Sequence, residues 1–248
     1  MSRLRKIGLI VASVIVVPML IGLVAGVVIV QTDWFRNFVR TKIVGAVEEA
    51  TGGKAEIGAF AFDWKHLRAD VRNFVLHGLE GANEAPLFRA DHLQVDLKLL
   101  SPFKGFVDIA YLLVDTPRAN VIVYADGHTN IPAPKLKKPS DKSGLETVVE
   151  LAVGKFDLVN AGVRFDEQKS ALNASGQNLR AHLAYNHLHP SYTGEIDWSQ
   201  LLVQSGNNPP LKVDIKLPVT MEKDKITLTN AQLTTPESQI VLRAPSSI

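Results

Sequence analysis

The chain has 248 residues, a formal net charge of +2 and no cysteine, which excludes disulfides, thiolate metal sites and thiol catalysis. Arg3, Arg5 and Lys6 precede the first acidic residue, Asp33, so the rest of the chain is close to neutral. A near-neutral chain without a basic stripe does not have the charge that binding to a phosphate backbone requires, and we expect no nucleic-acid partner.

The first thirty residues predict a membrane anchor. Residues 1–6 form a basic, cytoplasmic stub, and residues 7–30 form an uncharged run, where about 20 apolar residues suffice to span a bilayer. A cleavable signal peptide is the alternative, but its apolar stretch covers only about 7–15 residues and ends at small residues, which 27–31 do not offer. A buried helix of a soluble core is disfavoured because this helix is apolar all round.

Residues 33–51 predict a short amphipathic helix. Apolar side chains recur at spacings of three and four, Thr32-Asp33 supplies an N-cap and Gly52-Gly53 a stop. We weigh two positions for it, at the membrane surface or packed against the following domain. Trp34 and Phe35 also suit the aromatic belt of a membrane interface.

Beyond Gly53 the hydrophobic period changes to two, which is typical of strands with one polar face. We expect a first β-sheet segment over 54–131, a Pro/Lys linker over 132–144 and a second segment over 145–248. The second begins with a helix over 145–152 or, almost equally favoured, a strand. A change of phase predicts a bulge near Arg72-Asn73. The expected strands are 55–62, 67–76, 93–99, 107–114, 119–125, 155–158, 163–166, 179–185, 192–198, 211–217, 225–228 and 240–243.

Strands with one apolar face must bury that face, yet the sequence predicts almost no helix beyond Gly53 to cover it. The sheet could close on itself as a sandwich or barrel. It could instead curl into an open trough whose floor meets lipid, and the periodicity does not separate these two folds. Candidate lipid-contacting side chains of a trough are Leu93, Val95, Leu97, Leu99, Val121, Val123, Leu211, Val213, Ile215 and Leu217.

No pattern in the sequence indicates catalysis or a cofactor. The glycines form no phosphate-binding or dinucleotide motif, and no serine, histidine and acid follow a nucleophile elbow. His187 and His189 have a spacing that could chelate a metal, but they precede Pro190 in an apparent turn and are better explained as a solvated loop. We therefore expect no catalytic residue, no cofactor and no metal.

Three stretches in register, 62–78, 86–100 and 114–132, resemble the N-terminal region of TamB and AsmA-like envelope proteins, and residues 156–162 look like the recurring strand-turn unit of that family. The resemblance covers most of residues 1–245 and rests on strand patterns. It implies a β-taco, a long curled sheet with an apolar groove, anchored in the bacterial inner membrane with its bulk in the periplasm.

For function, the resemblance implies phospholipid transport toward the outer membrane and support of outer-membrane protein assembly or secretion, without catalytic residues. Phospholipid is then the expected ligand, and an outer-membrane TamA-like protein is the expected partner of a full-length C-terminus. Such proteins are usually several times longer than this chain, so we expect the sequence to be a fragment. The alternative is a non-catalytic scaffold whose self-closed β domain binds an envelope protein.

Overall fold

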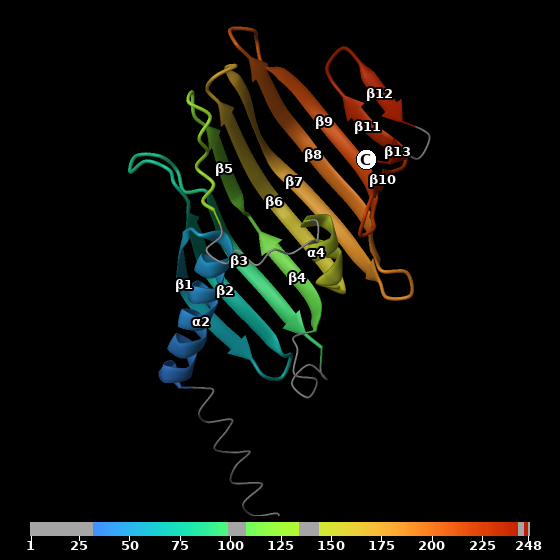
Figure 1. The fold of residues 1–248 in the computed structure, drawn as a ribbon. Coiled ribbons are helices and arrows are strands. Elements are labelled where there is room, and N and C mark those ends of the chain that lie inside the picture. The colour runs from blue at the N-terminus through green and yellow to red at the C-terminus, as the bar shows by residue number, and fades with distance from the viewer. Residues whose placement is uncertain (1–31, 99–107, 134–143, 243–245, 248) are drawn as a thin grey trace, which may run out of the picture. The chain divides into compact units, whose positions relative to one another are not determined.

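The computed structural model describes residues 32–98, 108–133, 144–242 and 246–247, which form a mainly β protein (Figure 1). The chain divides into two compact units, residues 1–43 and 44–248. The expected membrane span, 7–30, and most of the expected linker lie outside the described residues. Neither of the helices within the described ranges is long and apolar enough to cross a membrane.

Helix α2 (Asp33–Thr51) confirms the predicted amphipathic segment. The Thr32 hydroxyl accepts a hydrogen bond from the backbone N–H of Phe35 at 3.3 Å, which caps the first turn. Gly52 ends the helix at φ 77°, a conformation that costs glycine little. None of the helix residues is buried, and the rings of Trp34 and Phe38 stack with centroids 5.8 Å apart.

Thirteen strands within the described residues form one mixed sheet. They are β1 (Lys54–Asp63), β2 (Arg68–His77), β3 (Phe88–Leu97), β4 (Ile109–Asp115), β5 (Arg118–Val123), β6 (Lys155–Glu167), β7 (Leu172–Asn186), β8 (Ser191–Ser205), β9 (Leu211–Met221), β10 (Ile226–Leu228), β11 (Ala231–Thr234), β12 (Gln239–Leu242) and β13 (Ser246–Ser247). The second described helix, α4 (Gly144–Glu150), precedes β6 and decides between the helix and the strand expected there.

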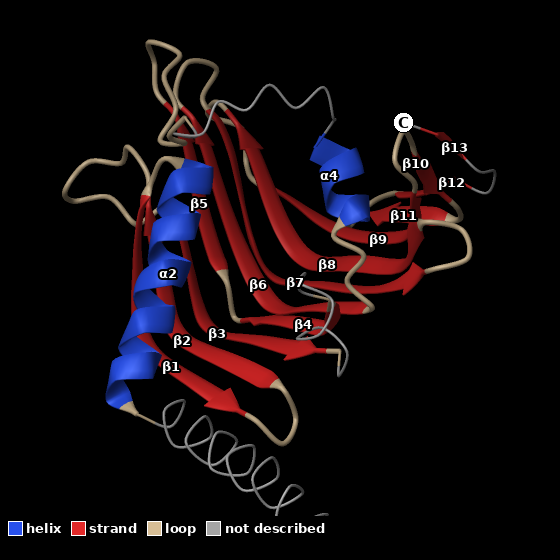
Figure 2. Cartoon of the chain, turned by 60° about the horizontal axis from the view of Figure 1, so that its bottom comes forward, coloured by secondary structure: helices blue, strands red, loops and turns tan. Residues whose placement is uncertain are grey.

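The strand order is β1-β2-β3-β4-β6-β7-β8-β9-β10-β13. Strand β5 continues the line of β4 between β3 and β6, and β11 extends the far end by pairing with β9 and β12. Strands β4 and β5 run parallel to β6, whereas the other pairs are antiparallel. The two predicted β segments therefore meet within one sheet, and Figure 2 shows that this sheet curves along its strand order.

The register separates the side chains into an apolar face and a polar face. Directly paired residues lie on the same face of a sheet. One line of pairs, from β3 to β9, defines the apolar face: Val95, Leu112, Phe156, Leu183, Gly194 and Val219. A second line defines the polar face: Arg68, Asp96, Tyr111 and Lys155, with Asp157 and His182 beside it.

A line of irregular backbone crosses the sheet. Asn73, Thr116, Asn160, Asn178 and Gln200 have φ between 51° and 63° and lie where the strand pairing skips residues, with a shift of register beside Asn160 and Gln200. Bulges of this kind bend strands and increase their twist. At Asn73 the burial of the β2 side chains changes phase as expected, but the pairings with β1 and β3 keep their register, so no extra residue is inserted and the predicted bulge is not present. The line bends the strands without interrupting the alternation on either side of it.

The prediction of separate strands over 155–158 and 163–166 is wrong. Residues 155–167 form the single strand β6, and Asn160 begins a bulge between the two predicted strands. Strands β3, β7 and β8 also extend beyond their predicted bounds, while β11 and β13 were not predicted.

Candidate functional site: the apolar face of the sheet

The structure places nine of the ten candidate lipid-contacting residues on the apolar face. Leu93, Val95 and Leu97 lie on β3 and pair with apolar residues of β4, such as Val114 and Leu112. The four β9 candidates, Leu211, Val213, Ile215 and Leu217, share their face with Val219 because they alternate with polar residues. The tenth residue, Leu99, lies outside the described residues.

The candidates fall into two groups rather than one patch. Val121 and Val123 lie on β5, next to the line of β3, and pair with Phe165 and Glu167 of β6. Three strands, β6, β7 and β8, separate these residues from the candidates of β9. The strands between them carry apolar side chains on the same face, which makes the surface continuous from β3 to β9.

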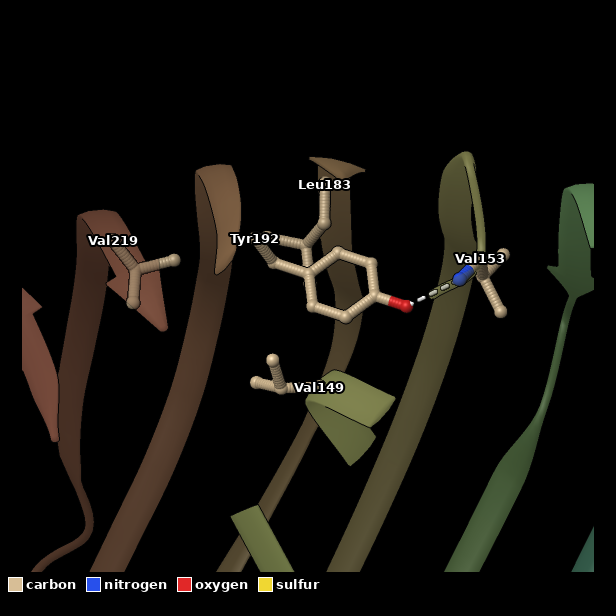
Figure 3. Packing of buried hydrophobic residues seen from close by; sticks show 5 residues of the cluster. All are labelled: Val149, Val153, Leu183, Tyr192 and Val219. Atoms are coloured by element: carbon tan, nitrogen blue, oxygen red, sulfur yellow. Dashed lines mark hydrogen bonds between the residues drawn. The ribbon is translucent and has the colours of Figure 1, made fainter. Parts of the chain in front are cut away.

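Helix α4 packs on part of this face. Val149 of the helix is fully buried, and Val153 follows it into the same cluster. The sheet contributes Leu183, Tyr192 and Val219, as Figure 3 shows. This cluster covers the part of β7, β8 and β9 that lies beside the β7–β8 turn.

A hydrogen bond holds the segment between α4 and β6 over this cluster. The Tyr192 hydroxyl accepts it from the backbone N–H of Val153 at 2.7 Å (Figure 3). Burial raises the pKa of the Tyr192 hydroxyl, so the neutral form persists above the usual range. The bond satisfies a buried backbone donor that has left helix α4 and has not yet joined a strand ladder.

A second buried patch lies at the β1 end of the apolar face. Ile57 and Ala90 are each 1% exposed, and Phe74 packs edge-on against Phe88 with ring centroids 6.0 Å apart. Between this patch and the α4 cluster, Leu93, Val95 and Leu97 are only half-buried. At the other side, Leu211 of β9 is 50% exposed. The described apolar face is thus covered at the β1 end and beneath α4, and partly open along β3 and at Leu211 of β9.

On the polar face, charged and polar side chains pair with one another. Arg68 donates two hydrogen bonds to Asp96, at 2.8 and 3.0 Å. Tyr111 donates to Asp157 at 2.8 Å, and His182 contacts the same carboxylate. Burial, followed by this bond, raises the pKa of Tyr111 to about 12. Hydrogen-bonded pairs of this kind are compatible with a surface in contact with water, whereas the opposite face carries apolar side chains.

Within the described ranges, no group of three or more histidine and acidic side chains could hold a metal ion. His187 and His189 lie in the turn between β7 and β8, where the side chain of Asn186 accepts a hydrogen bond from the backbone N–H of His189 at 3.2 Å. Single histidines lie beside single carboxylates, as His92 does beside Asp70 at 2.7 Å. These contacts are isolated pairs.

Several apolar-face residues were missed as candidates by sequence reasoning. They are Leu112, Val114, Phe156, Leu158, Leu183 and Ile196. Their alternation was visible in part, but the face on which they lie depends on parallel pairing of β4 and β5 with β6, which no local pattern reveals. Comparison with protein-family models and with curated proteins finds no match to this chain.

Proposed function

We propose that the protein is an inner-membrane-anchored periplasmic protein of the TamB/AsmA type, whose curled sheet offers its apolar face to phospholipid acyl chains as a β-taco-like groove. The observation that carries the proposal is a single sheet with one apolar face that the short helix α4 covers only in part. Half-buried Leu93, Val95 and Leu97 are the side chains that such a ligand would contact first.

The apolar side chains that remain partly exposed on this face favour a ligand that removes them from water. Complete burial of an exposed side chain of this size is worth roughly 1.5–3 kcal/mol, and a ligand gains the part of it that belongs to the area still exposed. A row of half-exposed leucine and valine side chains therefore favours a long apolar ligand over water. Acyl chains suit it because their contacts are non-directional and need no polar partner on the protein.

The membrane anchor and the non-catalytic role belong to the same proposal. The uncharged run over 7–30 supports a single span with the sheet in the periplasm. We propose that the groove takes part in phospholipid transport toward the outer membrane and in outer-membrane protein assembly or secretion. A TamA-like outer-membrane protein is the partner proposed for a full-length C-terminus.

A scaffold that binds an envelope protein is the second candidate. The partly open apolar face favours it as well, since exposed apolar surface also marks protein interfaces. The two functions differ in what copurifies with the full chain, which is phospholipid for the first and a stoichiometric protein for the second.

The test uses three single substitutions in the full chain. Leu97→Asp and Leu217→Asp place a charge on the apolar face, whereas Thr193→Asp places the same charge on an exposed position of the polar face. Lipids extracted from the detergent-purified proteins are quantified by mass spectrometry. We expect phospholipid with the unmodified chain and Thr193→Asp, and much less with the two apolar-face variants.

Circular dichroism of each variant checks that the sheet is retained. Equal lipid content in all four proteins would contradict the proposal. A lipid-free unmodified chain that carries a stoichiometric protein would favour the scaffold.

A further inference from the structure

A hollow of about 600 Å³ lies on the polar face, away from the surface proposed to bind acyl chains. Its charged lining consists of three arginines, Arg89 of β3, Arg118 of β5 and Arg164 of β6, and no aspartate or glutamate lines it. The register places all three on this face. Arg89 pairs directly with Arg118, and Arg164 pairs with Asn120, two residues beyond Arg118 on the same strand.

None of the three arginines forms an ion pair within the described part of the chain. Elsewhere on the same face the sheet balances its charges, as Arg68 does with Asp96. Directly opposed like charges in neighbouring strands destabilise a sheet. Arg89 and Arg118 are therefore a directly paired couple of like charges that no carboxylate of the lining balances.

The backbone holds Arg118 in place. Its guanidinium donates hydrogen bonds to the carbonyl of Pro117 at 3.0 Å and to that of Asn160 at 2.7 Å. The side chain crosses Gly162, where a Cβ atom would lie 2.7 Å from the Arg118 Cδ. The bulge at Asn160 and the glycine behind it thus make room for a guanidinium whose orientation is already fixed, which lowers the entropic cost of binding.

The rest of the lining combines neutral hydrogen-bonding groups with apolar residues such as Pro86 and Leu202. Ser175, Gln177 and Asn178 of β7 and Gln200 of β8 border the hollow at the line of irregular backbone. Guanidinium groups offer forked pairs of N–H donors that match the oxygens of phosphate. Three of them, with polar groups around them and no carboxylate, provide the chemistry for a doubly charged tetrahedral anion.

We propose that this hollow, named here the arginine pocket (Arg89, Arg118 and Arg164), binds a phosphate monoester. The same chemistry occurs in a free phosphate ester and in the headgroup of an anionic lipid. The site does not depend on the apolar face, so either proposal can fail while the other stands.

Isothermal titration calorimetry of the full chain in neutral detergent at low, constant salt tests the pocket. The ligands are inorganic phosphate, glycerol 3-phosphate and dihexanoyl phosphatidic acid, with dihexanoyl phosphatidylcholine as the lipid control. We expect saturable binding of inorganic phosphate and of both phosphate monoesters, and none of the control. A dissociation constant at least about tenfold lower for phosphatidic acid than for glycerol 3-phosphate assigns the lipid headgroup, and equal constants assign the free ester.

The matched variants are Arg89→Gln, Arg164→Gln and Arg72→Gln. Arg72 is an exposed arginine on the polar face of β2, outside the pocket. We expect Arg89→Gln and Arg164→Gln each to weaken binding about tenfold or more, and Arg72→Gln to leave it unchanged. Removal of the opposed charge also predicts that Arg89→Gln without phosphate unfolds at the same or a higher temperature than the unmodified chain.

Absence of binding to the unmodified chain would overturn the proposal. Binding that all three variants retain equally would overturn it as well, because a diffuse surface charge would then explain the signal.

Discussion

The Tyr192 hydroxyl and the backbone N–H of Val153 form a 2.7 Å hydrogen bond between strand β8 and the segment that leaves helix α4. Both residues are nearly fully buried. We predict that Tyr192→Phe destabilises the protein by about 1–3 kcal/mol, because it leaves a buried donor without an acceptor. Urea unfolding followed by tryptophan fluorescence measures the change.

Tyr185→Phe is the control for this bond. Tyr185 packs edge-on against Tyr192, with ring centroids 5.0 Å apart, but its hydroxyl makes no hydrogen bond within the described residues. Its loss should change the free energy of unfolding by less than about 0.5 kcal/mol. Equal effects of the two substitutions would show that ring packing, not the hydrogen bond, fixes the α4 segment.

Two neighbouring valines of helix α4 differ in their contact with the sheet. Val149 is fully buried against the sheet, whereas Val148 is 44% exposed. We predict a loss of about 2 kcal/mol for Val149→Ala, from the removed methyl groups and the cavity they leave. Val148→Ala should cost less than about 0.5 kcal/mol, and a reversed order would mean that the helix packs through its other side.

The line of irregular backbone predicts a reciprocal pair of effects. Thr116 has φ 51° and Asn160 has φ 53°, and a β-branched residue is strained in this region where asparagine is tolerated. We predict that Thr116→Asn stabilises the protein by about 0.5–1 kcal/mol and that Asn160→Thr destabilises it by about 1–2 kcal/mol. Chemical unfolding of both variants would disprove the account if their effects had the same sign.

The burial of Tyr111 and its hydrogen bond to Asp157 predict a loss of stability at high pH. The folded protein keeps the pKa of Tyr111 at about 12, above the ordinary value of 10. Between these values the folded state holds a proton that the unfolded chain releases, so stability is present below pH 10 and falls as the pH rises toward 12. Tyr111→Phe should flatten this fall and reduce the tyrosinate absorbance step near pH 12, to which Tyr124 also contributes. Parallel stability curves for the two proteins would contradict the assignment.

Local patterns in the sequence predicted the elements that local chemistry determines. The alternation of Leu93, Val95 and Leu97 predicted β3 and its apolar face, and the cap at Thr32 and the stop at Gly52 predicted the ends of α2. The phase change near Asn73 was read from the sequence correctly, but it comes from a residue at φ 52° rather than from an inserted residue, because the register with β1 and β3 does not shift.

At Asn160, a local sequence pattern led to a wrong prediction. Asparagine followed by alanine and glycine is typical of a turn, but here it forms a bulge inside β6 because strands on both sides supply partners. Only the fold could show this, since the parallel partners Arg118 and Gly162 are far apart in sequence. The arginine pocket was hidden for the same reason: its three guanidinium groups come from three strands that no local pattern brings together.

Site-specific photocrosslinking in living cells tests the central claim most directly. A photoreactive phenylalanine derivative replaces Val95 or Leu217 on the apolar face, and Gln94 or Lys216 at the neighbouring polar-face positions. We predict phospholipid adducts, identified by mass, at the two apolar-face positions and none at their polar neighbours. Lipid adducts of equal yield on both faces, or adducts at Val95 and Leu217 that contain only protein, would contradict a lipid-binding apolar face.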